Sequence, residues 1–496
     1  MYFGVYPQSA YTPVTAPGTP AEGTTYTDGN GTEFVYVASP NNSQGHYYKI
    51  ESIAWKVLSN FGGELFVVSE KNLDGGIPYH VDFEPVTWET STMRSWMNGY
   101  GASENDGGSS GTDYSAPGAN FLSRAFSAEE QAAISTTSVV NDNNGIAPGG
   151  SNTTDKIFLL SIAEATNTTY FADNAARIAA NTAYTASKPG MMSADAAESW
   201  WLRSSYSGSA ACITVDGSLS GTDVEYAHIN ALRTAFNLDM AYVILTSDAS
   251  GASAKSSATV GSGMIPAEPA GDILKLTVLN TTFATGFDAS ANKSVVRPGG
   301  TVSIDYTVAV LTAASQFVSC LLKNDSGDVL CYGKLADNSA SAAASVNVTI
   351  PGNLPAGDYT LEVFNEEANG DLYTDFASYP VVIAIIVTAV PSNPSNPSSP
   401  STPSSPQPTI DGGRGWDKIT DKVKDFQDSD KLDIDMNGTT DVPGSFLSRC
   451  RVCLAACAAR KSLPPHKRAS VKDWRGGNGN RNDRSFDSED IYIIDE

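Results

Sequence analysis

The clearest hydrophobic pattern in the chain is an alternation of apolar and polar residues between positions 272 and 389. It occupies positions 302 to 308, 346 to 350 and 359 to 363, with a period of two in each run. Because successive side chains of a strand point to opposite faces, this pattern predicts half-buried β-strands. About seven such strands, separated by turns rich in Gly, Pro and Asn, predict an all-β immunoglobulin-like sandwich.

Residues 1 to 247 show a mixed pattern of short aromatic strands and short helices. Ser127 with Glu130 and Ser161 with Glu164 have the spacing of capping boxes, which open helices. A third helix is predicted where Met93, Trp96 and Met97 share a face. Five of the seven tryptophans, at 55, 88, 96, 200 and 201, lie in this region. We therefore expect an α+β domain with an aromatic core.

The chain has two segments with the composition of linkers. Positions 391 to 408 hold seven prolines among eighteen residues, the rest being mostly Ser. In polyproline II geometry this run would separate its neighbours by roughly 55 Å, whereas an ordinary disordered linker would set no fixed distance. Residues 248 to 271 are rich in Ser, Ala and Gly and form the weaker joint. The predicted units are 1–247, 272–389, 412–447 and 448–496, with linkers at 248–271 and 390–411.

Composition and charge narrow the class of protein. The net charge is −24, the pI is about 4.5, and charged residues are 17% of the chain against about 25% in typical proteins. An acidic surface repels phosphate backbones, so no nucleic-acid partner is expected. The longest apolar run, positions 381 to 390, is about half the length that crosses a bilayer, so no membrane-spanning segment is expected. Low charge with abundant Ser, Thr, Asn and Gly favours an extracellular protein.

Several motifs in residues 2 to about 246 occur in the order found in a known family. They include Tyr2-Phe3-Gly4-Val5-Tyr6-Pro7-Gln8-Ser9, Ile53-Ala54-Trp55-Lys56-Val57-Leu58, Leu65-Phe66-Val67-Val68-Ser69-Glu70, Met93-Arg94-Ser95-Trp96-Met97-Asn98, Trp200-Trp201-Leu202-Arg203-Ser204 and Ala231-Leu232-Arg233-Thr234-Ala235-Phe236-Asn237-Leu238. This set resembles an uncharacterised domain common in surface proteins of Gram-positive bacteria. That domain is similar in pattern to C-type-lectin-like and sulfatase-modifying-factor-like domains. Ala231 and Thr234 depart from the Gly and Pro of the family, which affects a local turn.

The resemblance implies a lectin-like α+β fold in residues 1 to 247, with positions 205 to 230 presenting side chains to a ligand. The expected contacts are Tyr206, Asp223, Glu225, Tyr226, His228 and Asn230, because a loop that mixes Tyr with small polar groups has the chemistry of a binding surface. The bulky Trp200, Trp201 and Phe236 are expected in the core. Arg203 and Arg233 are expected to hold loops through carbonyl or carboxylate oxygens.

Residues 272 to 388 resemble an immunoglobulin-like repeat often found beside that first domain. Residues 412 to 447 resemble the start of a small surface-protein module, so a small C-terminal α/β fragment is expected. No signal peptide is visible, and because Tyr2 already lies in the first motif, the resemblance implies a truncated start.

Convergent catalytic groups are scarce in the sequence. The four histidines, at 46, 80, 228 and 466, form no metal-binding pair, and no Gly-x-Ser-x-Gly elbow or phosphate-binding loop occurs. Asp433, Asp435 and Asn437 match only the first half of a calcium loop, which would need Glu where Gly444 stands. No cofactor, no metal and no enzymatic activity are therefore expected. A pair of glycosidase carboxylates remains an alternative, because its members meet only in the fold.

Cys320 and Cys331 flank a predicted turn at positions 324 to 328. If Asp325 and Ser326 form a two-residue turn, the two cysteines lie opposite each other at a spacing that a disulfide can bridge. If Gly327 instead forms a bulged three-residue loop, the register slips and the thiols stay apart.

The segment from 448 to 484 differs from the rest of the chain, with ten Lys or Arg and two Asp. Its three cysteines, at 450, 453 and 457, have only His466 nearby as a fourth zinc ligand. A basic partner-binding tail is a second interpretation. The favoured interpretation is an out-of-frame translation after Leu447, because the acidic, apolar β pattern of the resembled module stops there.

These observations predict an extracellular bacterial surface protein that binds a protein or glycan ligand without catalysis. A purely structural stalk and a secreted carbohydrate-active hydrolase are the alternatives.

Overall fold

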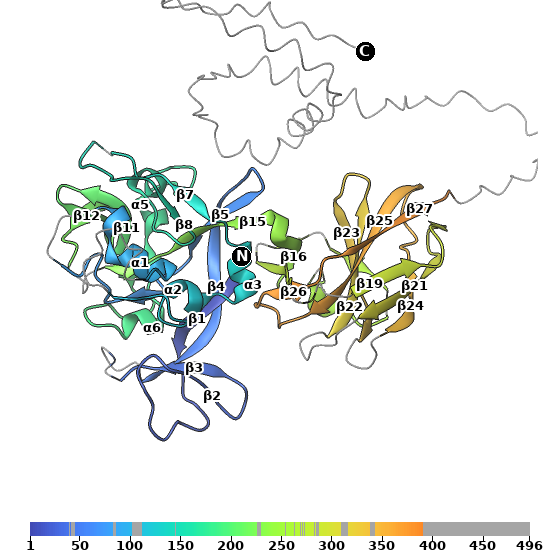
Figure 1. The fold of residues 1–496 in the computed structure, drawn as a ribbon, viewed down its shortest axis with the longest axis horizontal. Helices are drawn as coiled ribbons and strands as arrows, with labels where there is room; N and C mark the ends of the chain where they lie inside the picture. The colour runs from blue at the N-terminus through green and yellow to red at the C-terminus, as the bar shows by residue number, and fades with distance from the viewer. Residues whose placement is uncertain are drawn as a thin grey trace, which may run out of the picture. The chain divides into compact units, whose positions relative to one another are not determined.

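The structure is a computed structural model that describes residues 1–389 apart from 39, 41–44, 83–85, 102–111, 144, 226–229, 253, 262, 268, 270, 272, 282, 284–286, 309–315 and 338–342. The described residues are 44% strand and 11% helix, with six α-helices. Figure 1 shows the arrangement of these elements. The expected α+β lectin-like fold of residues 1 to 247 is therefore wrong. The expected C-terminal fragment and tail, 412–447 and 448–496, lie outside the described residues.

The first sheet centres on a long hairpin of β4 and β5. Its neighbours follow the order β15-β5-β4-β1, with β3 also paired to β4 and β2 to β3. The strands are β1 (Tyr2–Ala10), β2 (Thr25–Thr27), β3 (Glu33–Tyr36), β4 (Tyr47–Phe61), β5 (Glu64–Ser69), β15 (Ala235–Asp239) and β16 (Val243–Asp248). Gly62 and Gly63 have φ of 67° and 88° and make the tight turn of the hairpin, a backbone that glycine adopts without strain.

The second sheet has five strands in the order β13-β12-β11-β14-β6. They are β6 (Asp74–Gly75), β11 (Trp200–Tyr206), β12 (Ser209–Ile213), β13 (Leu219–Thr222) and β14 (Ala231–Leu232). Two small pairs complete the strands of this region: β7 (Thr137–Val139) with β8 (Thr153–Asp155), and β9 (Ala179–Ala180) with β10 (Ala197–Glu198). This sheet contains the motif around Trp200 and, in β12 and β13, part of the segment that the resemblance assigns to ligand binding.

The helices are short. They are α1 (Thr92–Asn98), α2 (Phe121–Ala125), α3 (Ala128–Ala133), α4 (Ile162–Ala165), α5 (Asn174–Arg177) and α6 (Ala183–Ala186), with 3-10 turns η1 (Trp88–Thr90), η2 (Met240–Tyr242) and η3 (Lys255–Ser257). Both predicted capping boxes are confirmed, because Ser127 with Glu130 and Ser161 with Glu164 make the reciprocal side-chain bonds. Each capping box begins a helix of only one or two turns. Helices this short do not form a separate layer on the sheets.

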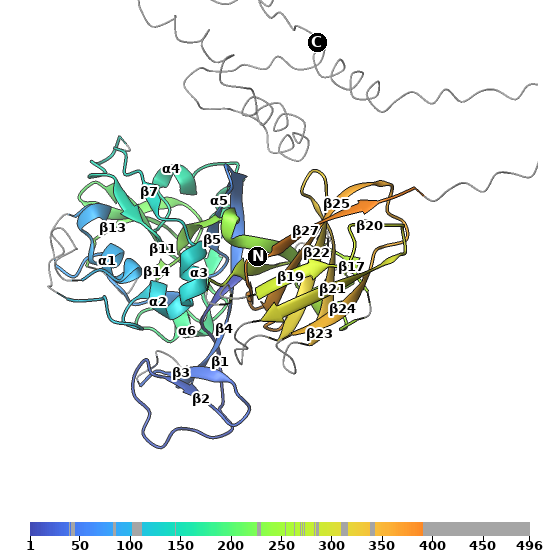
Figure 2. The same ribbon diagram turned by 45° about the vertical axis from the view of Figure 1, so that its right-hand side comes forward.

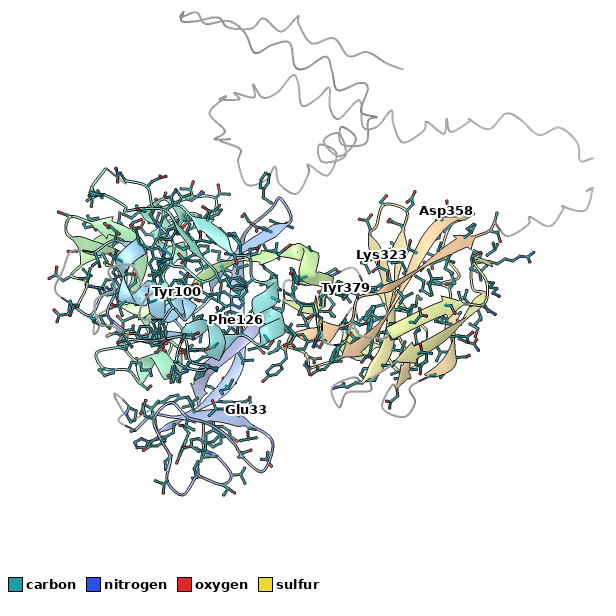
Figure 3. All side chains as sticks on the ribbon, viewed as in Figure 1. Glu33, Tyr100, Phe126, Lys323, Asp358 and Tyr379 are labelled. Atoms are coloured by element: carbon teal, nitrogen blue, oxygen red, sulfur yellow. The ribbon has the colours of Figure 1, made fainter. Side chains whose placement is uncertain are left out.

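Aromatic rings build the core of the first 247 residues. Trp88, Trp200 and Trp201 are fully buried, as the sequence predicted for the last two. Phe236 packs edge-on against Trp55 with ring centres 4.6 Å apart. Phe126, labelled in Figure 3, packs 5.6 Å from Phe236. Rings of this size fill the space between short, irregular elements.

The remaining described strands lie between residues 265 and 387. They are β17 (Ile265–Pro266), β18 (Leu274–Leu279), β19 (Phe287–Ala291), β20 (Val295–Val296), β21 (Thr301–Val308), β22 (Phe317–Asn324), β23 (Val329–Asp337), β24 (Ala343–Thr349), β25 (Gly357–Glu367), β26 (Asp375–Ala377) and β27 (Val381–Val387). Sheet β19-β21-β24 faces strands β22, β23 and β25 across a shared hydrophobic core (Figure 2). The alternating residues 302, 304, 306 and 308 are all buried in it, as their period predicts.

The two cysteines of the β22–β23 hairpin are not opposite each other. Cys320 pairs with Gly333, and Leu322 pairs with Cys331, after a register shift beside the turn. Gly327 has φ of 85°, so the bulged loop forms and the two-residue turn does not. Both thiols are free, so of the two alternatives that the sequence left open, the one without a disulfide is found.

Strand β18 connects the two groups of strands. It pairs with β16 in antiparallel fashion and with β26 and β1 in parallel. The described part of the predicted linker 248–271 contains η3 and β17, and β17 pairs with β23.

Candidate functional site

The residues predicted to contact a ligand start with Tyr206, at the end of β11. Ser207 and Gly208, with φ of 49° and 87°, form a two-residue turn into β12. The ring of Tyr206 covers Gly221 on β13, where an added Cβ would lie 2.2 Å from Cδ1 of Tyr206. Tyr206 therefore packs on the sheet and is only partly exposed.

The other predicted contacts are divided between surface and interior. Asp223 is exposed and accepts a hydrogen bond from Ser209 Oγ at 3.1 Å. Glu225 is half-buried, and Asn230 is only 1% exposed. Tyr226 and His228 lie outside the described residues. Among the four described members, Asp223 is the one that is exposed to solvent.

An open groove of about 310 Å³ lies elsewhere in the same region. It is lined by residues of β4, β5, β7, β11, β15 and α4 and by loop positions between them, which together are Ser59, Phe61, Glu64, Phe66, Thr137, Ser138, Val139, Val140, Phe158, Glu164, Tyr170, Arg203 and Asn237. We call this surface the aromatic groove. Its volume is at the lower end of the range for ligand pockets.

Three rings form one wall of the aromatic groove. Phe66 stacks on Phe158 with ring centres 6.0 Å apart, and Tyr170 meets Phe66 edge-on at 5.8 Å. Phe158 is only 2% exposed and packs against Phe66, while Phe66 and Tyr170 are partly exposed. The partly exposed rings provide apolar area at which a ligand can displace water.

The floor of the aromatic groove is an ion pair. The guanidinium of Arg203 binds both carboxylate oxygens of Glu164, one of them through a 3.0 Å bond from Nη2. Arg203 also donates to the carbonyls of Leu159 at 2.8 Å and Val140 at 3.1 Å. The expected structural role of Arg203 is confirmed by these bonds. Its Nε lies buried with no acceptor among the described residues.

Arg233, the other arginine expected to be structural, lies in the core. It donates to the carbonyls of Ser69 and Arg177 and lies over the ring of Trp200. Burial lowers its pKa to about 10, because the charged form loses its hydration there. Its contacts confirm the structural role.

Phe61 stands at the rim of the aromatic groove and is 87% exposed. It directly precedes the Gly62-Gly63 turn, so its ring projects from the tip of the β4–β5 hairpin. The sequence-based prediction missed this residue. The available signal was a large aromatic beside two turn glycines, a position from which a side chain cannot reach a core.

A second hollow, of about 500 Å³, is lined by Met1, Trp55, Glu70 and Ile273 among others. Although larger, it has two aromatic residues in its lining, Tyr2 and Trp55, and Trp55 is 3% exposed with its indole N–H donating to the carbonyl of Phe3. The aromatic groove therefore has the better combination of accessible rings and polar groups.

Buried carboxylates of this region are engaged by structural partners. Asp155 accepts hydrogen bonds from Trp88, Arg94, Tyr100 and Thr153. Burial is the main reason that the pKa of Tyr100 is raised, and the charge of Asp155 adds to it. Within the described ranges, no group of three His, Cys, Asp or Glu side chains is arranged to hold a metal. In the same part of the chain, no helix combines the length and apolar character needed to cross a bilayer.

Comparison with known families identifies one domain. Residues 62–240 match a family described as Domain of unknown function (DUF6273). The sequence-based resemblance to an uncharacterised domain is thus confirmed at that level. Among curated proteins, none matches this chain. The matched range contains every residue that lines the aromatic groove except Ser59 and Phe61.

Proposed function

We propose that this chain is an extracellular protein whose DUF6273 domain binds a carbohydrate in the aromatic groove without catalysing a reaction. The observation that supports this proposal is the pairing of partly exposed rings with hydrogen-bonding groups in one open groove. Phe66 and Tyr170 provide the rings, and Glu164, Ser138 and Asn237 provide polar atoms. Binding sites typically combine a mainly apolar lining with a few placed polar groups.

A carbohydrate suits this surface better than a compact apolar ligand. Sugar rings have apolar C–H faces that lie against aromatic rings, and hydroxyl groups that exchange hydrogen bonds with carboxylates and amides. Glu164 is 27% exposed, so its carboxylate is held by Arg203 and still faces solvent. An open groove also admits an internal segment of a longer chain, whereas a closed cavity would require a free end.

The proposed location rests on composition and on the resemblance to surface-protein domains. A net charge of −24 keeps the chain away from anionic polymers, and the Pro-rich run 391 to 408 is suited to spacing modules apart. In this proposal the strands between residues 272 and 389 act as an immunoglobulin-like spacer. A purely structural stalk is the second candidate, favoured by the strand-rich character of that region.

A glycan array probed with the full chain tests the proposal. The groove variant is Phe61→Ser, because that side chain is 87% exposed and its removal leaves the core intact. The matched control is Val14→Ser, which also removes an exposed apolar side chain, 67% exposed and outside the groove lining. We expect Phe61→Ser to weaken binding about fivefold to tenfold and Val14→Ser to leave it unchanged.

The outcomes separate the candidates. Absence of binding to any glycan or protein favours the stalk, and release of sugar from a bound glycan favours a hydrolase. Binding that survives Phe61→Ser but is lost in Asp223→Ala would assign the contact to the segment 205 to 230 and refute the groove.

A further inference from the structure

Four charged side chains lie together in the interior where η3, β18, β25 and β26 meet. Lys255 and Lys275 are 3% and 7% exposed at their side chains, and Glu366 and Asp375 are fully buried. Isolated charges are expensive to bury, so a cluster of this kind requires precise partners or a chemical function.

Lys255 lies at the centre of the cluster. Its Nζ contacts Oδ2 of Asp375 at 2.7 Å, Oγ1 of Thr277 at 2.7 Å and, more closely, Oε1 of Glu366. The amine nitrogen of Lys255 is thus adjacent to the carboxyl group of Asp375, and it also donates a hydrogen bond to the carboxylate of Glu366. Burial alone lowers the pKa of Lys255, but the charges of Glu366 and Asp375 outweigh it and the net pKa is raised. The resting amine is therefore an ammonium.

The other oxygen of Asp375 is held by two donors. Nζ of Lys275 lies 2.8 Å from Oδ1, and the backbone N–H of Asn369 donates to the same oxygen at 2.6 Å. Donors placed in this way stabilise the negative charge that develops on a carboxyl oxygen when a nucleophile adds to its carbon.

Glu366 is positioned by two hydroxyl groups. Tyr332 donates to Oε2 at 2.6 Å, and Ser319 donates to the same oxygen. Its Oε1 remains directed at Lys255. Oε2 of Glu366 is thereby fixed in place, and Oε1 is positioned to take a proton from the amine of Lys255 and to pass it on.

We propose that Lys255 and Asp375 form an intramolecular amide cross-link, made by the protein itself with Glu366 as the proton-transfer residue. The bond joins Nζ of Lys255 to Cγ of Asp375. It would close a covalent ring between residues 120 positions apart and tie η3 to β26.

The reaction balances without any additional reagent. Glu366 accepts a proton from the ammonium of Lys255 and passes it to Oδ2 of Asp375, and the neutral amine then adds to Cγ of the carboxyl group so formed. Lys275 and the Asn369 N–H stabilise the oxygen Oδ1 during addition. Glu366 next takes a second proton from the nitrogen, which is positively charged after the addition, and gives it to Oδ2. The C–Oδ2 bond then breaks, and that oxygen leaves as water while Glu366 returns to its carboxylate form. The sum is one ammonium and one carboxylate converted into one amide and one water.

The cross-link also removes two of the four buried charges. Before the reaction the cluster holds two cations and two anions, whereas afterwards only Lys275 and Glu366 remain charged. Because a neutral amide costs much less to bury than an ion pair, the low-dielectric interior favours the product.

The intact mass of the purified full chain tests the proposal. We expect a mass lower than that of the sequence by one water, and a branched peptide after digestion in which Lys255 is joined to Asp375. The variant Glu366→Gln retains the size of the side chain but cannot take the proton, so it should show the full mass while remaining folded by circular dichroism. Lys255→Met should also show the full mass.

The matched control is Lys323→Ala. Lys323 forms an ordinary ion pair with Glu362 at 2.7 Å on the same sheet, so this variant should keep the missing water. A full mass for the wild-type chain overturns the proposal, whether or not the variants fold. A missing water located in a linear peptide, such as a cyclised aspartate, overturns it as well.

Discussion

Replacing Arg203 by Ala tests how the floor of the aromatic groove is held together. The substitution removes a side chain that is 4% exposed and bonded to Glu164, Leu159 and Val140. Hydrogen bonds to charged groups contribute about 1.5 to 3 kcal/mol each, but only where water cannot replace the lost partner.

The magnitude follows from the exposure of each partner. Leu159 is fully buried, so loss of the hydrogen bond to its carbonyl should destabilise the folded state by about 2 kcal/mol. Val140 is 45% exposed and can recover a water molecule. Glu164 is 27% exposed, which limits the ion pair to about 1 kcal/mol. We therefore expect Arg203→Ala to lower the free energy of unfolding by about 3 kcal/mol.

Urea unfolding followed by tryptophan fluorescence is the suitable assay, because five of the seven tryptophans lie in residues 1 to 247. The comparison variant is Glu164→Gln, whose amide oxygen can still accept from the Ser161 N–H and from Arg203. It should cost about 1 kcal/mol or less. A loss below about 1 kcal/mol for Arg203→Ala, or an equal loss for both variants, would refute the assignment of Arg203 as the main support.

Two further predictions concern residues outside the groove. Gly217 has φ of 79°, and an added Cβ would lie 1.8 Å from the carbonyl oxygen of Asn174, so Gly217→Ala should cost about 3 kcal/mol in urea unfolding. Gly208→Ala, with φ of 87° but open space around it, should cost only about 1 kcal/mol, and equal losses would contradict the clash. Burial raises the pKa of Glu130 above its ordinary value of 4.5, so the folded state keeps this proton to higher pH than the unfolded state does. The contribution of Glu130 to stability should therefore fall as pH rises from 4.5 through the raised pKa. Unfolding free energies of wild type and Glu130→Gln across that range check this, and parallel curves would disprove it.

Parts of the fold could be predicted because they depend on local physics. The alternation at 302 to 308 buries every second side chain of β21, and the capping boxes at Ser127 and Ser161 form as expected. The helices that they open are too short to support an α+β fold, since a capping box marks the start of a helix but not its length. The sequence could not decide which residue pairs with Cys320. That register depends on the turn type, which the positive φ of Gly327 sets.

The aromatic groove could not be predicted from local patterns. Arg203 and Glu164 are 39 residues apart, and they meet Phe66 only after the sheets have formed. Tyr206 and Asn230 were expected at a ligand surface because of their residue types. The structure instead packs Tyr206 on Gly221 and buries Asn230, since aromatic and amide groups also stabilise sheets and loops.

The most direct test of the central claim compares Tyr170→Leu with Asp223→Ala in the affinity of the full chain for the glycan that it captures best. If the aromatic groove is the binding surface, Tyr170→Leu weakens binding about tenfold, and Asp223→Ala changes it by less than about twofold. The reverse order, or no change in either variant, would contradict carbohydrate recognition by this groove.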